Sequence, residues 1–278
     1  MTARQTSCLL ALIVATAAPC GALAQGDLRA DLVIGNRHVW RGINRVSGWV
    51  GQAQGSGSLR LGRGAIGAGV SEYREVFRAA EGNPTEVGLD RRGLGERNWW
   101  AEYRLPVGPV AIGGGAVHYT YHGTPALGGR SGNDNTTEVF ATVEVTRTYL
   151  SPALAAYWDV DRARGLYLEA SGRIPILGWP FPPEVFVYLD GALGFSVGED
   201  PDPARPADLS YYSGDGFTHA QLGLSVDVKR TSRVALGGGV RFTAGIDDLA
   251  KRGADGRDRW LFATLWAGVT LGVGLPDR

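Results

Sequence analysis

The side chains best suited to catalysis in this sequence are its four histidines, His38, His118, His122 and His219. Nucleophilic hydrolysis needs a histidine within hydrogen-bond reach of a serine, and a third group that orients the ring. His118 and His122 fall on one face of a predicted strand, and Ser131 follows on the adjoining loop. These three residues are the candidate site for a lipid acyl hydrolase, although two histidines in contact with water explain the pattern more simply.

Metal and phosphate chemistry is not supported by the spacing of the candidate ligands. The His118-x-x-x-His122 spacing suits a zinc ion only on a helix, and on a strand the two residues lie about 13 Å apart at 3.3 Å per residue. The glycine runs at 113–115 and 237–239 lack the lysine and the helix of a phosphate-binding loop. We therefore expect no catalytic residue, no metal and no cofactor.

The N-terminal segment indicates export from the cytoplasm. Arg4 gives a positive start, residues 9–18 form a short apolar run, and Ala22-Leu23-Ala24 matches a cleavage site. The apolar run is too short to span a bilayer, which takes about 20 residues. We expect residues 1–24 to be a cleaved signal peptide and residues 25–278 to form a single domain.

The composition of this predicted domain excludes several classes of protein. Because the signal contains one arginine and no acid, the domain keeps all 28 acidic residues and 27 of the 28 basic ones. This balance argues against nucleic-acid binding, which requires a basic surface. No stretch approaches the roughly 18 apolar residues of a membrane-spanning helix. Both cysteines, Cys8 and Cys20, fall within the signal, so the domain has no disulfide and no thiolate metal site.

Period-two alternation along the chain indicates an all-β fold. In one segment Leu166, Leu168 and Ala170 form a charge-free face, while Tyr167 and Glu169 lie on the other face. Twelve such strands are predicted near 30–43, 50–61, 64–76, 97–106, 109–121, 135–147, 152–162, 165–175, 184–197, 216–229, 232–246 and 258–274. An even number of strands of about ten residues is typical of a transmembrane antiparallel β-barrel.

The lengths of the predicted connections favour a membrane barrel over a soluble exported β-protein. The four connections longer than ten residues, 77–96, 122–134, 198–215 and 247–257, all fall at one end of the predicted sheet. Outer-membrane barrels have this asymmetry, with long extracellular loops and short periplasmic turns. Aromatic residues near predicted strand ends fit the two girdles at the membrane interfaces, and these are Trp99, Trp100, Tyr103, Tyr149 and Trp260.

Two short motifs resemble those of a known family. The stretch 30–43, which ends in Trp40-Arg41-Gly42-Ile43, resembles the opening of TorF-family porin-like proteins, and residues 151–169 resemble a hairpin in the middle of that family's chain. The resemblance implies a porin-like barrel of the bacterial outer membrane and no particular solute. The C-terminus lacks the terminal aromatic residue that the barrel assembly machinery reads in many such proteins. Expected partners are outer-membrane lipids, small solutes and that assembly machinery.

The polar faces of the strands predict a charged lumen. Its expected lining residues are Arg37, Arg41, Arg60, Glu138, Glu144, Asp159, Asp161, Glu169, Arg173, Asp190, Asp227 and Arg241. Acids predominate on the predicted strands six to nine, and bases on strands eleven, one and two. In a ring of twelve these groups face each other, which predicts a filter for small charged or zwitterionic solutes. Alternatively the charges pair across a narrow interior and close it, because twelve strands lie between filled and water-conducting barrels.

The sequence therefore predicts a non-enzymatic, porin-like protein of the bacterial outer membrane, through which small charged or zwitterionic solutes pass passively. A structural or adhesion barrel without catalysis is the second interpretation. An outer-membrane lipid acyl hydrolase is the third.

Overall fold

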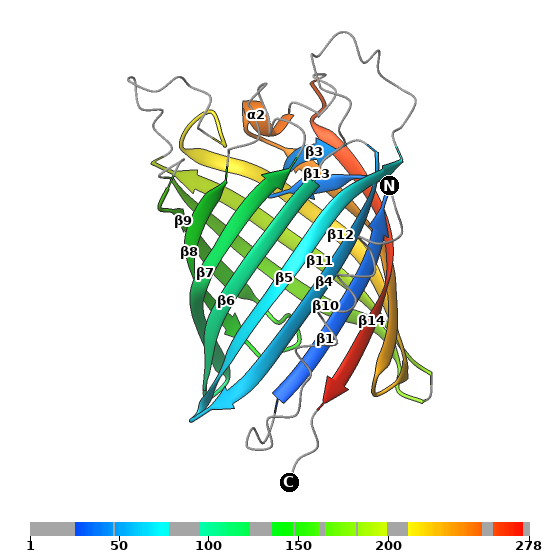
Figure 1. Ribbon diagram of the computed structural model, residues 1–278. Coiled ribbons are helices and arrows are strands. Elements are labelled where there is room, and N and C mark those ends of the chain that lie inside the picture. Colours follow the sequence, from blue (N-terminus) through cyan, green and yellow to red (C-terminus); the bar gives the residue numbers. More distant parts are fainter. Residues whose placement is uncertain are drawn as a thin grey trace.

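The computed structural model describes residues 26–46, 48–77, 95–122, 135–146, 148–161, 165–181, 183–198, 211–251 and 258–274. The predicted signal peptide and Ser131 lie outside these residues. Within them the chain forms a closed antiparallel barrel of twelve strands, together with a separate two-stranded hairpin (Figure 1). The predicted fold class and strand number are confirmed.

The barrel wall is a continuous ladder in which each strand pairs with the next one along the chain. Its strands are β1 (Gly26–Gly35), β4 (Trp49–Leu61), β5 (Gly64–Phe77), β6 (Gly95–Val107), β7 (Val110–His122), β8 (Thr136–Val145), β9 (Ala153–Asp159), β10 (Leu166–Trp179), β11 (Glu184–Val197), β12 (Gly216–Thr231), β13 (Val234–Gly245) and β14 (Leu261–Gly274). The ring closes where β1 pairs with β14, from Asp27 opposite Gly274 to Gly35 opposite Trp266. Closure removes the free edges that would otherwise leave backbone groups unpaired in lipid.

Alternation places apolar side chains outside the barrel and polar ones inside. On β12, Leu222 and Leu224 are exposed on the outer surface, whereas Ser225 is buried. Successive side chains of a strand point to opposite faces of the sheet, so the pattern gives the wall one hydrocarbon-facing side. Asp159 and Arg173 bond to other inward-facing polar groups, Thr136 and Ser225 respectively.

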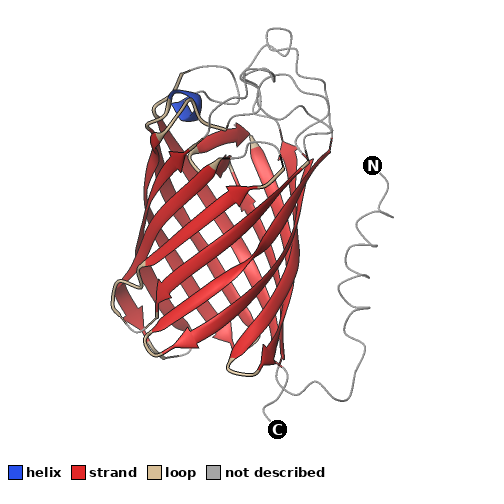
Figure 2. Ribbon diagram, turned by 90° about the vertical axis from the view of Figure 1, so that its left-hand side faces the viewer, coloured by secondary structure: helices blue, strands red, loops and turns tan. Residues whose placement is uncertain are grey.

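The two ends of the barrel differ in their connections (Figure 2). One end, which we call the turn end, carries the links between β4 and β5, β6 and β7, β8 and β9, β10 and β11, and β12 and β13. Three of these links are two-residue turns, and Gly62 and Gly108 have φ values of +62° and +63° there, a conformation that glycine adopts without strain. The strand ends that connections 78–94, 123–135, 198–215 and 246–260 join all lie at the opposite end, as the sequence predicted.

The first predicted strand, 30–43, is wrong in its second half. The wall strand β1 ends at Gly35, and the chain then forms the hairpin of β2 (His38–Trp40) and β3 (Ile43–Val46). Asn36 ends the pairing with β14, because its side chain accepts a hydrogen bond from the Leu265 N–H at 2.9 Å. Arg41 and Gly42, with φ values of +46° and +82°, make the hairpin turn. We call this end of the barrel the hairpin end.

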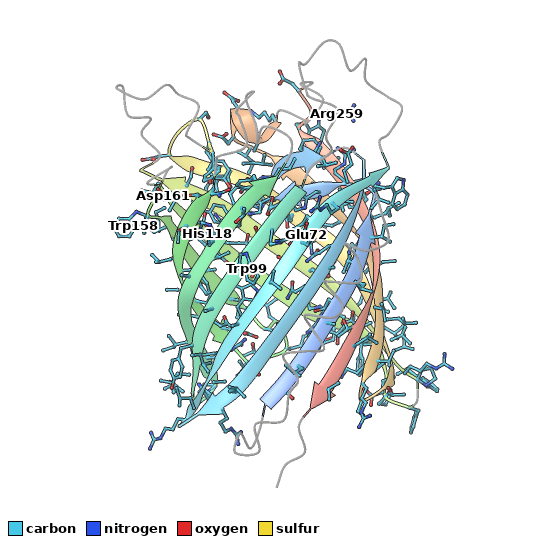
Figure 3. The ribbon with its side chains drawn as sticks, viewed as in Figure 1. Glu72, Trp99, His118, Trp158, Asp161 and Arg259 are labelled. Atoms are coloured by element: carbon cyan, nitrogen blue, oxygen red, sulfur yellow. The ribbon has the colours of Figure 1, made fainter. Side chains whose placement is uncertain are left out.

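The outer surface carries aromatic side chains near the strand ends. Trp99, Tyr103, Tyr149 and Trp260 are all exposed, and Figure 3 shows Trp99 on the outer wall. Trp100 is an exception to the predicted girdle, because its side chain lines a cavity inside the barrel. One short helix, α2 (Asp248–Lys251), lies at the hairpin end. In the described part of the chain, no helix is both long and apolar enough to cross a membrane.

A charged cluster on the outer wall was not predicted. Ser71 and Tyr73 line a cavity inside the barrel, so Glu72 between them points outward (Figure 3). Its carboxylate contacts Arg74 at 2.5 Å and Arg97 at 2.6 Å. The cluster lies near the last residues of β5, at the hairpin end. A charge-free outer face is therefore confined to the middle of the wall, where a bilayer has its hydrocarbon core.

Candidate functional site: the lumen and its hairpin

The β2–β3 hairpin lies inside the barrel and contacts the wall on every side. The contacts run from His38 with Tyr73 of β5, through Arg45 with Glu96 of β6 and Tyr121 of β7, Arg41 with Glu138 of β8 and Tyr167 of β10, and Gly42 with His219 of β12, to Arg37 with Phe262 of β14. At its centre Ile43 and Asn44 are fully buried. The hairpin therefore lies across the lumen at this level.

The first anchor of the hairpin is a two-pronged ion pair between Arg41 and Glu138. The two terminal guanidinium nitrogens, Nη1 and Nη2, each donate to one carboxylate oxygen at 2.6 Å. The Tyr119 hydroxyl donates to the same carboxylate at 3.0 Å. The guanidinium also lies over the rings of Tyr157 and Tyr167, at 4.1 and 4.6 Å from their centroids. Two parallel charge-assisted hydrogen bonds are among the strongest contacts that proteins form.

Burial of this pair determines its electrostatics. The side chains of Arg41 and Glu138 are only 9% and 2% exposed. Burial disfavours the charged guanidinium, but the interactions with Tyr119 and with the negative charge of Glu138 outweigh it, so the pKa of Arg41 is raised well above its usual value. Arg41 is therefore a permanent cation, and removal of Glu138 would leave that cation unpaired inside the barrel.

The second anchor joins Arg45 of β3 to Glu96 of β6. The guanidinium lies 2.5 Å from the carboxylate and donates to the Tyr121 hydroxyl at 2.9 Å. Glu96 also accepts a hydrogen bond from the Asn98 amide at 2.8 Å, and it is fully buried. Burial opposes the charge of Arg45 as well, yet Tyr121 and Glu96 together raise the pKa of its guanidinium above the usual value.

Beneath the hairpin lies a cavity of about 400 Å³ whose wall is largely aromatic. Trp40 enters it from the hairpin, and Trp100, Phe140 and Tyr157 enter it from the barrel wall. Its polar lining includes Glu102 of β6, which makes no ion pair or hydrogen bond with any other residue that the structure describes.

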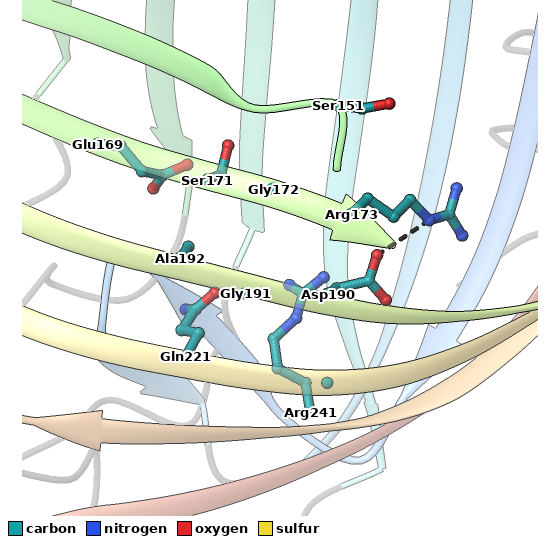
Figure 4. Close-up of a pocket in the computed structure, with 11 residues that line it drawn as sticks. Ser151, Glu169, Ser171, Gly172, Arg173, Asp190, Gly191, Ala192, Gln221 and Arg241 are labelled. Carbon is teal, nitrogen blue, oxygen red and sulfur yellow. Dashed lines mark ion pairs between the residues drawn. The ribbon is translucent and has the colours of Figure 1, made fainter. Parts of the chain in front are cut away.

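A second cavity, of about 270 Å³, lies toward the turn end (Figure 4). It contains a network in which Arg173 of β10 contacts Asp190 of β11 at 2.9 Å and Asp227 of β12 at 3.1 Å. The Ser225 hydroxyl joins this network by donating to Asp190 at 2.6 Å. The three charged side chains are 26% to 40% exposed, so this end of the lumen is open to water.

The predicted lining residues fall into four groups. Glu138 and Asp159 are buried near the hairpin, while Arg60, Glu144, Glu169, Arg173, Asp190, Asp227 and Arg241 occupy inward positions nearer the turn end. Arg37 and Arg41 reach the lumen from the hairpin segment and not from a wall strand. Asp161 lies beyond the end of β9 and is exposed at the rim, because the strand stops at Asp159 (Figure 3).

The charges pair locally more than the predicted opposition of two walls implies. Arg173 pairs with acids of the two following strands, Arg104 of β6 pairs with Glu144 of β8, and Arg41 crosses to Glu138. Side chains that are close on one face of a sheet interact more strongly than those separated by the diameter of a barrel. At the hairpin end, Arg41 and Arg45 of the hairpin pair with Glu138 and Glu96 of the wall.

Arg45 and Glu96, which form one of the two anchors, were not predicted from the sequence. Arg45 lay in a predicted loop, and Glu96 lay one residue before a predicted strand. A signal was present in the spacing of Arg37, Arg41 and Arg45, since three regularly spaced arginines in one short segment suggest a common set of acidic partners.

The candidate hydrolase residues do not assemble into a catalytic group within the described residues. His118 faces outward on β7, and its Nδ1 lies 2.9 Å from the Thr137 hydroxyl (Figure 3). No described carboxylate contacts the His118 ring. Also within the described part of the chain, no cluster of three His, Cys, Asp or Glu residues could hold a metal ion.

Comparison with known proteins supports the fold and no finer identity. No protein-family model and no curated protein sequence matches the chain. Among solved structures it is similar to LpxR from Salmonella typhimurium, with a TM-score of 0.52 and 8% identity over 88% of this chain and 99% of that one. It is also similar to the COG4313 outer membrane channel from Pseudomonas putida F1, with a TM-score of 0.51 and 7% identity over 92% and 100%. The chain has the fold of bacterial outer-membrane β-barrels.

Proposed function

We propose that the protein is a porin-like channel of the bacterial outer membrane that passes small charged or zwitterionic solutes passively, and that the hairpin closes it. The observation that carries the proposal is the contrast within one lumen. Arg104, Glu144 and Arg173 are 36% to 48% exposed in the part nearer the turns, whereas Arg41 and Arg45 are buried in the hairpin.

Unpaired charge in the lumen favours a channel over a purely structural barrel. Glu102 and Arg241 have no ion-pair partner among the described residues. Such groups do not stabilise a purely structural barrel, because an unpaired charge costs folding free energy unless water or a ligand solvates it. A ring of ionised groups in contact with water is, however, what selects ions and polar solutes in membrane pores.

The resemblance to TorF-family porins supports the same proposal. Its most specific part, Trp40-Arg41-Gly42-Ile43, forms the turn of the hairpin and carries the Arg41 anchor. In this proposal the motif belongs to the element that closes the channel. Passage of a solute then requires the hairpin to move away from the wall residues that it contacts. This is a movement of a loop segment within a rigid barrel.

Conductance in planar bilayers tests the proposal. Residues 37–46 are replaced by a short Gly-Ser linker, and the tight turn at residues 232–233 is replaced by Asn-Gly in a matched control. We expect the wild type and the control to open rarely, and the linker variant to conduct steadily with at least a tenfold larger mean current. Heat-dependent gel migration checks that each barrel is folded. A folded linker variant that does not conduct would falsify the proposal.

We further propose that the protein is not an enzyme, with lipids of the outer membrane and the barrel assembly machinery as its partners. The isolated position of His118 on the outer wall supports this. An acyl-hydrolase assay of the detergent-solubilised protein, with His118→Ala as the comparison, tests it. Hydrolysis that disappears in His118→Ala would contradict the proposal. Fractionation of cell envelopes tests the proposed location, and protein found in the soluble fraction would refute it.

A further inference from the structure

The cavity near the turn end contains one acidic and one basic residue that are not neutralised by a neighbour. Glu169 of β10 accepts a single hydrogen bond, from the Tyr167 hydroxyl at 2.8 Å, and has no cationic partner among the described residues. Arg241 of β13 has neither an ion pair nor a hydrogen bond within the same described part. Both side chains line the cavity of about 270 Å³.

Strand register shows that Glu169 and Arg241 are too far apart to neutralise each other. Arg241 is level with Gly223, Asp190 and Arg173 across the ladder. Glu169 is therefore four residues along and three strands across from it, or roughly 13 Å by 14 Å at 3.3 Å per residue and 4.8 Å per strand. The two side chains extend toward a common space without meeting, and that space is the cavity.

The other charges at this level leave these two groups available. Arg173 contacts both Asp190 and Asp227, and Ser225 donates to Asp190, so these three charges belong to one network of net charge −1. Between Glu169 and Arg241 the lining consists of small or neutral residues, which Figure 4 shows as Ser171, Ala192 and Gln221. Ser171 and Gln221 have no hydrogen-bond partner among the described residues, so their polar groups also face the cavity unpaired.

We propose that this cavity binds a compact zwitterion, such as a free amino acid, whose ammonium group contacts Glu169 and whose carboxylate contacts Arg241. A ligand with one positive and one negative group neutralises both residues at once, and Ser171 and Gln221 supply neutral hydrogen bonds between them. A planar guanidinium suits a carboxylate because it can donate two parallel hydrogen bonds. The inference rests on the proposed function, since it names the solute class that the open part of the lumen selects.

Binding is measured first, separately from passage. Glycine and γ-aminobutyrate are titrated calorimetrically into the folded full-length protein in detergent, and acetate and methylammonium serve as half-molecules with a single charge. We expect the zwitterions to bind at least tenfold more tightly than either half-molecule. Glu169→Gln and Arg241→Gln should each weaken zwitterion binding about tenfold or more, because each removes a charge-assisted contact. Arg104→Gln, which removes a lumen arginine outside the cavity, should leave binding unchanged.

The second measurement distinguishes failure of this inference from failure of the proposed function. Uptake of glycine is followed in vesicles that contain the hairpin-linker variant, with and without Glu169→Gln. Conductance without preferential zwitterion binding would overturn the inference and leave the channel proposal standing. Zwitterion binding without conductance or uptake would overturn the channel proposal. Equal weakening by Arg104→Gln and Arg241→Gln would show a general effect of lumen charge and would also overturn the inference.

Discussion

The two ends of the lumen use the same kind of contact, an arginine paired with a carboxylate, in opposite surroundings. At the hairpin end, Arg41 and Glu138 are 9% and 2% exposed, and tyrosines surround the pair. Toward the turn end, Arg173 and Asp190 are 40% and 26% exposed. A buried pair is costly to break, because the remaining charge cannot regain water, whereas a pair in contact with water contributes little to stability. Equivalent chemistry thus holds the hairpin at one end and lines a cavity at the other.

The largest effect is expected from Glu138→Ala. This substitution leaves the buried Arg41 without its carboxylate, which destabilises the seated hairpin by about 3–5 kcal/mol. Single-channel open probability in planar bilayers should rise strongly. The double variant Arg41→Met with Glu138→Leu removes both charges and should regain most of the closed state. If Glu138→Ala stayed as closed as the wild type, the buried pair would not be what holds the hairpin.

A smaller effect is expected from Gly42→Ala in the hairpin turn. Gly42 has a φ of +82°, and a Cβ there would lie 2.4 Å from the Cβ of His219. Strain of this kind costs roughly 1–3 kcal/mol. Gly62→Ala is the matched control, because Gly62 has a φ of +62° and nothing within 4 Å of the added carbon. Unfolding in urea, followed by tryptophan fluorescence, should show the larger loss of unfolding free energy for Gly42→Ala. Equal losses would mean that the wall does not pack closely against the hairpin turn.

At the turn end, Arg173→Gln should affect selectivity more than stability. The pair is partly exposed, so the free energy of unfolding should fall by no more than about 1 kcal/mol. Asp190 and Asp227 would, however, lose their shared cation. In the hairpin-linker channel, the reversal potential under a KCl gradient should shift toward cation selectivity. An unchanged reversal potential would mean that the network lies outside the conducting path.

The smallest effect is expected from Glu184→Gln. Its carboxylate lies 3.8 Å from Lys229, and the two side chains are 42% and 60% exposed. Solvent screens such a pair, so unfolding free energy should change by less than about 0.5 kcal/mol. Urea midpoints that differ clearly from the wild type would break the contrast between the two ends, because a well-solvated pair would then be as important as a buried one.

The barrel wall was predictable because its physical requirement repeats along the sequence. Every wall strand must present apolar groups to hydrocarbon, so alternation such as Leu222, Leu224 and Val226 appears in each segment. Antiparallel pairing of consecutive strands then follows from short links such as residues 62–63. The sorting of long connections to one end needed only the order of the strands, and it was confirmed.

The hairpin was not predictable from the same pattern. Residues 38–43 were predicted to continue the first wall strand, and a strand pattern does not distinguish a strand in the wall from one folded inside the barrel. The information that decides lies in single residues, such as Asn36, which ends β1, and Gly42, which allows the turn. The partners of Arg41 and Arg45 come from strands 50 or more residues away. Such pairs depend on ring closure and register, which no local segment reveals.

The position of the hairpin in the chain has a consequence for assembly. It directly follows β1, yet its partners extend from Tyr73 to Phe262. The wall residues that the hairpin contacts are therefore not all in place until the last strand has been synthesised and β14 has paired with β1. Contacts between residues so distant in sequence form late, since the entropy of closing long loops opposes them. We therefore expect a newly inserted molecule to have a complete barrel wall before the hairpin occupies the interior.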